Sequence, residues 1–295
     1  DRSRGLGDVY KRQPVYFTNF NYENVLCDTY SIFHDSCRIF NRYILLEVVE
    51  VIWITGDTHG DWIHRLNMDS FPEQREMTKD DYVIVLGDFG IWRDSPQQRW
   101  YLNWLEEKHF TTLFIDGNHE CYDILDAYPV EEWHGGKVHF IKPSVIHLMR
   151  GQVFDIDDLK FFTFGGAASH DISDGVLEID DPRVKEWRDD PDKMYRINHI
   201  SWWEREMPGQ EEMDEGIKNL AEHDNKVDFI LTHCTASSTA ALLSHGLYKP
   251  DKLTNYLEEI RCNVDYKRWL CGHYHDNKAI TIKDIVLYEQ IVRIA

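Results

Sequence analysis

Short apolar runs alternate with polar segments from Val51 onward, and this pattern predicts buried strands. Three runs stand out in the first part of the pattern, VIWIT at 51–55, YVIVL at 82–86 and TLFI at 112–115. Each run has the length and composition of a strand that is buried on both faces. Each also ends directly at a short polar motif, so we expect chemistry where these strands end.

The segment from Ser95 to Lys108 predicts a helix between the second and third runs. Ser95 suits the capping position, and Pro96 suits the first helical position. An apolar face is supplied by Trp100, Leu102, Trp104 and Leu105. A strand and a helix that alternate in units of about 30 residues are typical of parallel strands joined by crossover helices. Such sheets bind their ligands at the carboxyl ends of the strands.

The middle of the chain predicts antiparallel pairing and a second sheet. Its strand-like runs are short and separated by Pro, Gly and Asp. They are Lys137 to Ile141, Val145 to Met149, Gln152 to Ile156 and Lys160 to Phe164.

A polar, Trp-rich stretch follows, and we interpret Asp180 to Glu222 as a surface-facing helical insertion. Its helix-compatible tracts are Asn198 to Arg205 and Glu211 to Ala221, and disorder of its first part is the alternative. The last third returns to strands that end at motifs, Val227 to His233 and Tyr266 to His273. A helix from Pro250 to Arg261 bridges them, and strands close the chain between Ile285 and Ile294.

The first fifty residues do not share this regularity. Residues 1–13, DRSRGLGDVYKRQ, resemble translated sequencing-adapter sequence, and we exclude them from the fold. Residues 14–50 lack helix caps and turn residues at positions that would divide the segment into helices and strands. We therefore expect 1–50 to be a non-native or upstream-derived extension and 51–295 to be one domain. A native N-terminal extension or a poor signal peptide is the alternative.

Charge and cysteine content narrow the classes of function. The 295-residue chain has a formal net charge of -20, which argues against binding a long nucleic acid by its phosphates. The six cysteines form no CxxC pair or disulfide framework, so we expect free thiols and a cytoplasmic location. Cys234 and Cys271 lie beside motifs. We interpret them as small buried residues on strands rather than as soft metal ligands. No apolar run is long enough to predict a membrane span.

Five motifs carry the candidate chemistry. In chain order they are GDTH (56–59), GD (87–88), GNHE (117–120), TH (232–233) and GHYH (272–275). Their side chains offer carboxylate, amide and imidazole groups, a set that suits manganese, iron or zinc better than calcium. A single histidine is more often structural, but five such motifs at strand ends predict a paired metal site.

These motifs resemble the calcineurin-like metallophosphoesterase family, and the resemblance runs from Val51 to the C-terminus. It implies a four-layer α/β/β/α sandwich with two central mixed β-sheets. It also implies two metal ions, one held by Asp57, His59, Asp88 and His275 and the other by Asp88, Asn118, His233 and His273.

Two cations about 3.5–4 Å apart can hold phosphate oxygens and lower the pKa of a bridging water, so that a hydroxide attacks phosphorus in line. His119 is then free to donate a proton to the leaving oxygen or to stabilise the transition state. We therefore predict a metal-dependent phosphoester hydrolase for a small phosphomonoester or phosphodiester. The alternatives are a nuclease or nucleotide phosphodiesterase on the same site, and a non-catalytic interaction module on this fold.

The chain departs from the protein Ser/Thr phosphatase branch, which expects GDxVDRG where this chain has GDFGIWRD. The phosphate-binding arginine of that branch has no match at its usual offset, although Arg93 and Asp94 follow in the same loop. Asp116 and Glu120 are the candidates to orient His119. Weaker candidates for the pocket are Trp92, Tyr122, Gly165, Gly166, His170 and Asp171. The substrate, the native metals and the oligomeric state are left open.

Overall fold

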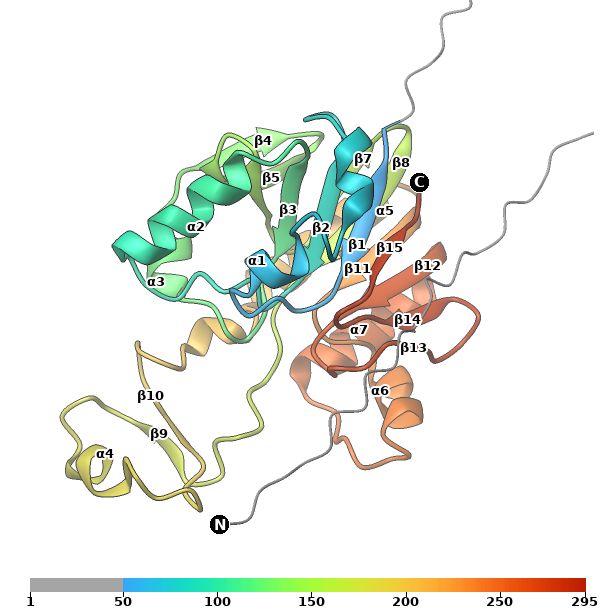
Figure 1. Ribbon diagram of the computed structural model, residues 1–295. Helices are drawn as coiled ribbons and strands as arrows, with labels where there is room; N and C mark the ends of the chain where they lie inside the picture. Colours follow the sequence, from blue (N-terminus) through green and yellow to red (C-terminus); the bar gives the residue numbers. More distant parts are fainter. Residues whose placement is uncertain (1–49) are drawn as a thin grey trace, which may run out of the picture. The chain divides into compact units, whose positions relative to one another are not determined.

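Two β-sheets form the centre of the computed structural model, which describes residues 50–295 (Figure 1). The first sheet has the strand order β15-β1-β2-β3-β6-β5-β4, and the second has the order β13-β14-β12-β11-β8-β7. Both sheets are mixed, because antiparallel strands flank a parallel centre in each. The expectation for residues 1–50 lies outside the described residues apart from Glu50.

The strand bounds follow the predicted runs closely. The first sheet contains β1 (Ile52–Thr55), β2 (Tyr82–Leu86), β3 (Thr111–Ile115), β4 (Val130–Trp133), β5 (Gly136–Lys142), β6 (Val145–Leu148) and β15 (Ile291–Arg293). The second sheet contains β7 (Gln152–Ile156), β8 (Leu159–Phe164), β11 (Lys226–Thr232), β12 (Asp265–Cys271), β13 (Lys278–Ala279) and β14 (Asp284–Val286).

Helices cover the outer face of the first sheet. They are α1 (Trp62–Arg65), the 3-10 helix η1 (Pro72–Glu76), α2 (Pro96–Glu106) and α3 (Tyr122–Leu125). Helix α2 begins as predicted, because the Ser95 hydroxyl accepts a hydrogen bond of 3.1 Å from the backbone of Gln98. Strand β2 is buried on both faces, with Val83 and Val85 packed against this helical layer and Ile84 turned toward the second sheet.

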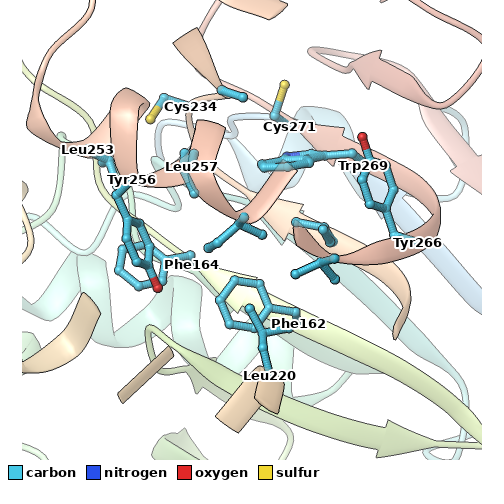
Figure 2. Packing of buried hydrophobic residues seen from close by; sticks show 14 of the residues in the cluster. Phe162, Phe164, Leu220, Cys234, Leu253, Tyr256, Leu257, Tyr266, Trp269 and Cys271 are labelled. Atoms are coloured by element: carbon cyan, nitrogen blue, oxygen red, sulfur yellow. The ribbon is translucent and has the colours of Figure 1, made fainter. Parts of the chain in front are cut away.

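Helices α5 (Gln210–Glu222) and α7 (Lys252–Asn263) cover the outer face of the second sheet. Figure 2 shows Leu220 and Leu257 packed with Phe162 and Trp269 in this layer. Cys234 and Cys271 are buried in the same hydrophobic cluster, which supports their interpretation as core residues. The layers are therefore α/β/β/α, and the predicted fold class is confirmed.

The middle of the chain differs from the prediction in one respect. The four short runs do not all belong to a second sheet, because β5 and β6 pair with each other and β6 pairs parallel to β3 in the first sheet. Only β7 and β8 join the second sheet, as an antiparallel pair at its edge.

The stretch between β8 and α5 divides into two parts. Strands β9 (Gly175–Leu177) and β10 (Tyr195–Ile197) form a small parallel sheet around α4 (Pro182–Trp187), and Figure 1 shows it projecting from the two main sheets. The tract 198–205 forms turns and the start of the 3-10 helix η2 (Glu204–Glu206), whereas the prediction allowed a helix there. Helix α5 buries Met213 and Leu220 in the core and so belongs to the helical layer.

The final third contains one further helix, α6 (Ser237–Leu243), between β11 and α7. Among residues 50–295, no helix has both the length and the apolar character needed to cross a membrane.

Candidate metal centre

The five motifs come together because their strands end at one edge of the two sheets. Strands β1, β2 and β3 are parallel neighbours in the first sheet, and β11 and β12 are parallel neighbours in the second. The loops that follow them touch across the two sheets, since the His273 backbone N–H donates to Asp57 Oδ1 at 2.9 Å. We call the seven predicted ligands the metal cluster: Asp57, His59, Asp88, Asn118, His233, His273 and His275.

One group of possible ligands consists of Asp57, His59 and His275, whose donor atoms lie close enough to hold one ion. The Nε2 atoms of His59 and His275 are 3.0 Å apart, and His275 Nε2 is 3.3 Å from Asp57 Oδ2. Asp88 borders this group, because its Oδ2 is 3.7 Å from His59 Nε2.

A second group gathers around His233 and Asp88. His233 Nε2 lies 3.4 Å from Asp88 Oδ1 and 3.2 Å from Asn118 Oδ1. Its other ring nitrogen, Nδ1, lies 2.9 Å from the carbonyl oxygen of Leu86. A carbonyl at that position holds the proton on Nδ1 and leaves the Nε2 lone pair for a metal ion. Both carboxylates reach both groups, because Asp88 borders the first group and Asp57 Oδ1 lies 3.8 Å from His233 Nδ1 in the second.

His273 is placed by its ring rather than by a recorded contact of its nitrogens. Its ring centre is 5.0 Å from that of His233 and 6.1 Å from that of His170. Burial, together with the nearby charge of His233, lowers the pKa of His273 to about 3. The imidazole is therefore neutral at ordinary pH, which is the form that binds metals.

The electrostatics of the metal cluster call for a cation. Asp57 and Asp88 are each only 1% exposed, and within the described residues their side chains pair with imidazoles alone, not with Lys or Arg. Burial alone would raise the pKa of Asp88, but the charge of His233 and its hydrogen bond outweigh burial and hold that pKa well below the ordinary range. Against the effect of burial, the two carboxylates raise the pKa of His233 to about 10. The two buried carboxylates draw protons onto the neighbouring imidazoles because, within residues 50–295, no permanent cation pairs with them. The same negative charge would favour the binding of divalent cations.

The local backbone also supports a binding role. His59, Asp88, His273 and His275 all have positive φ angles, between 43° and 67°. Such conformations cost energy in residues other than glycine and tend to occur at functional sites. Two motif glycines leave room for the carboxylates, because a Cβ atom at Gly117 would overlap Asp88 and one at Gly272 would overlap Asp57. This explains why glycine precedes the ligands in these motifs.

His119 lies beside the metal cluster without a carboxylate partner for its ring among the recorded contacts. Its backbone N–H donates to Asp88 Oδ1 at 2.7 Å, and its ring centre is 5.5 Å from that of His59. Burial lowers the pKa of its imidazole. Of the two predicted orienting residues, neither is placed for that task. Glu120 accepts hydrogen bonds from the backbone of Phe89, Gly90 and Ile91.

Asp116 instead belongs to a second buried set, which we call the arginine cluster: Asp116, Tyr122, His139, His147 and Arg150. Arg150 donates to Asp116 Oδ2 from Nε at 2.8 Å and from Nη2 at 2.5 Å. The Tyr122 hydroxyl donates to the same oxygen at 2.9 Å, and His147 Nε2 lies 3.2 Å from Oδ1. The opposite charge of Arg150 overcomes burial and keeps the pKa of Asp116 well below its usual range.

The remaining sequence candidates lie in three different places. Near the metal cluster, the Trp92 indole donates to the His119 carbonyl at 3.1 Å, and His170 packs beside His273. Gly165 and Gly166 border Asp116 and Arg150, so they make room for the arginine cluster. Arg93 has no side-chain partner within residues 50–295, and Asp94 pairs with Arg99 on the surface.

Sequence reasoning missed two arginines, Arg150 in the arginine cluster and Arg196, which pairs with Asp171 near the metal cluster. Neither lies in a recognisable motif. Their only local signal is their place, Arg150 directly after a strand-like run and Arg196 within the polar stretch before α5.

The fold and the metal cluster define a class of protein, an α/β/β/α metallohydrolase. The sequence model of one family, described as calcineurin-like phosphoesterase, matches residues 51–277, and the chain belongs to this family of phosphoric ester hydrolases. The family implies a phosphoester substrate.

Comparison with curated proteins gives no match. Among solved structures, the chain is similar to phosphopantetheinyl hydrolase (PptH) from Mycobacterium tuberculosis, with 15% sequence identity and a TM-score of 0.39 over 81% of this chain and 90% of that chain. This likeness is too low to transfer the activity of that protein.

Proposed function

We propose that the chain hydrolyses a small phosphomonoester or phosphodiester with two metal ions in the metal cluster. Asp57, His59, Asp88 and His275 would hold one ion, and Asp88, Asn118, His233 and His273 the other. The observation that carries this proposal is the pair of buried carboxylates balanced only by imidazoles among the described residues. The mixture of oxygen and nitrogen donors favours manganese, iron or zinc.

When bound, two such ions would neutralise phosphate charge and lower the pKa of a water molecule. The protein positions this chemistry through its own contacts. Asp88 is held by the backbone of His119, and His233 is held by the Leu86 carbonyl. His119 borders the ligands and lacks a recorded carboxylate partner, which supports a role as proton donor to the leaving oxygen.

The acidic chain favours small substrates over long nucleic acids, and its free cysteines agree with a cytoplasmic location, which stays a prediction. The described cysteines, Cys121, Cys234, Cys262 and Cys271, are all free thiols. The assignment of residues 51–295 to one domain, with an unrelated extension before it, is likewise our proposal.

Hydrolysis of a generic monoester and a generic diester in the presence of manganese tests this function. Asp88→Asn should lower kcat/KM at least about 1,000-fold, because bound metals contribute several kcal/mol to transition-state stabilisation. Metal analysis of the two proteins should show loss of bound manganese in the variant.

Equal activity of the wild type and Asp88→Asn would refute the proposed site. A strong preference for the diester would favour a nucleotide phosphodiesterase. A folded wild-type protein that binds no transition metal would instead support a non-catalytic module.

A further inference from the structure

A cleft of about 370 Å³ is lined by Asp171 and by residues between 193 and 201, and a short segment of chain connects it to the metal cluster. Three consecutive residues connect the two places. The Ser169 hydroxyl accepts a hydrogen bond of 3.4 Å from the Asn118 amide, His170 packs beside His273, and Asp171 lines the cleft. A substrate held at the metals could therefore extend into this cleft.

The cleft contains an arginine that presents a planar fork. Arg196 donates from Nε to Asp171 Oδ1 at 3.1 Å and from Nη2 to Asp171 Oδ2. Both side chains are partly exposed, so solvent and ligands can reach the pair. Guanidinium forks recognise carboxylate and phosphate with the same two-bond geometry. The Asp171 carboxylate thus occupies a position that an incoming anion could take.

The rest of the lining adds a second cation and an apolar wall. Lys193 reaches the cleft, with its Nζ 3.7 Å from Asp174 Oδ1. Met194, Tyr195 and Ile197 supply apolar surface along β10. Positive charge is scarce in a chain with a net charge of -20, so two cationic side chains beside the candidate active site are informative. Together they suit an organic group that ends in an anion.

In a phosphomonoester whose phosphate is held at the metal cluster, the alcohol that leaves is the only part of the substrate that can extend along this segment toward the cleft. The cleft is therefore placed to receive the leaving group of such a substrate.

We propose that this cleft binds a carboxylate or phosphate group on the leaving-group part of the substrate, with Arg196 exchanging Asp171 for that anion. This inference rests on the proposed function. It narrows the substrate class to phosphoesters whose alcohol portion carries a second negative charge.

Three aryl phosphates that share one ring test the inference. Their para side chains end in a propanoate, an ethylphosphonate or a neutral propanamide, which leaves the reacting phosphate almost unchanged. The wild type should show a kcat/KM at least about tenfold higher for the better anionic ester than for the amide, since hydrogen bonds to charged groups are the stronger ones. The two anionic esters distinguish carboxylate from phosphate recognition.

Two variants should move this preference in opposite directions. Arg196→Gln should bring the ratio of anionic to neutral substrate close to one, whereas Asp171→Asn should raise it by freeing the guanidinium. Arg183→Gln is the matched control, because Arg183 forms the same kind of pair with Asp181 but does not line the cleft. Its ratio should equal that of the wild type.

The three phenol products provide a readout that does not need catalysis. Ligand-observed saturation-transfer NMR should detect binding of an anionic product but not of the amide, and Arg196→Gln should abolish the difference. A chain that hydrolyses no ester but binds the anion through Arg196 would refute the proposed function and retain the subsite.

A wild type with no preference in kinetics and none in binding would overturn the subsite and retain the hydrolase. If Arg196→Gln fails to fold, Asp171→Asn still decides, because an unchanged ratio in that variant would also overturn the proposal.

Discussion

The metal cluster and the arginine cluster bury carboxylates next to the same loop by different means. In the arginine cluster, Asp116 is matched by a guanidinium that is itself buried. In the metal cluster, the ion-pair partners of Asp57 and Asp88 among the described residues are all imidazoles, and the other recorded donors to these carboxylates are backbone N–H groups. A guanidinium keeps its charge at all ordinary pH values, but an imidazole can release its proton. The first arrangement is permanent, and the second can exchange protons for metal ions.

The two clusters are joined through the GNHE motif and the residue before it. Asp116 anchors the start of this loop, Asn118 two residues later belongs to the metal cluster, and the His119 backbone donates to Asp88 of that cluster. Tyr122 strengthens the anchor, because its hydroxyl lies within hydrogen-bond distance of both Asp116 Oδ2 and the Gly117 carbonyl and can donate its one proton to either. We infer that the arginine cluster stabilises the loop, while the metal cluster holds carboxylates whose imidazole partners can give up their protons when a cation binds.

The largest effect on stability is expected for Arg150→Met. This change leaves the Asp116 carboxylate buried without its cation, which typically costs about 3–5 kcal/mol. Urea denaturation followed by circular dichroism measures the loss. The double variant Arg150→Met with Asp116→Asn should recover much of it, because no unpaired charge is left behind.

If Arg150→Met is as stable as the wild type, the arginine cluster does not stabilise the fold and the contrast between the clusters fails. The exposed Arg183→Gln variant serves as the control, and we expect no measurable change for it.

The next prediction concerns the contribution of His139, in the arginine cluster, to the pH dependence of stability. Burial and the neighbouring His147 lower the pKa of His139 to about 4, from an ordinary value of 6.5. Between pH 4 and pH 6.5, His139 binds a proton in the unfolded chain but not in the folded protein. Stability therefore falls as the pH drops from 6.5 to 4, by up to about 3 kcal/mol.

The free energy of unfolding measured against pH checks this effect. His139→Gln should flatten the acid side of the curve relative to the wild type. Parallel curves for the two proteins between pH 4 and 6.5 would contradict the assignment.

The sequence predicts one of these clusters and not the other, for a physical reason. Each predicted metal ligand follows a strand-like run within a short motif, so local pattern is enough to propose it. The ion pair between Asp116 and Arg150 joins residues 34 positions apart, and no local sequence pattern predicts it. Arg196 and Asp171 are likewise 25 positions apart within an irregular stretch.

The fold shows the same division between local and long-range information. The cap at Ser95 and the bounds of β2 are local properties and are confirmed. The sheet to which β5 and β6 belong depends on pairing with β3, and a short apolar run looks the same in either sheet. Helix α5 was expected at the surface, yet its role in the core depends on packing against the second sheet.

Metal binding should stabilise the protein through the metal cluster alone. Manganese at 100 times its dissociation constant should raise the free energy of unfolding by about 2.7 kcal/mol, because only the folded chain presents the site. Asp88→Asn should show almost none of this increase. Asp116→Asn should begin from a lower stability but keep the increase.

Thermal melts with and without manganese, after chelation of any bound metal, measure these shifts. An equal shift in the wild type and in Asp88→Asn would place the bound ion elsewhere.

The smallest change that tests the comparison adds one methyl group at a glycine next to each cluster. A Cβ at Gly117 would overlap Asp88, and one at Gly165 would overlap Asp116, while neither glycine has a positive φ. Each alanine variant should therefore cost about 1–3 kcal/mol of stability through crowding alone. Gly117→Ala should also weaken manganese binding, measured by calorimetry, because it displaces a ligand. Gly165→Ala should leave the manganese affinity unchanged, and an equal loss in both variants would mean that the two clusters act as one unit.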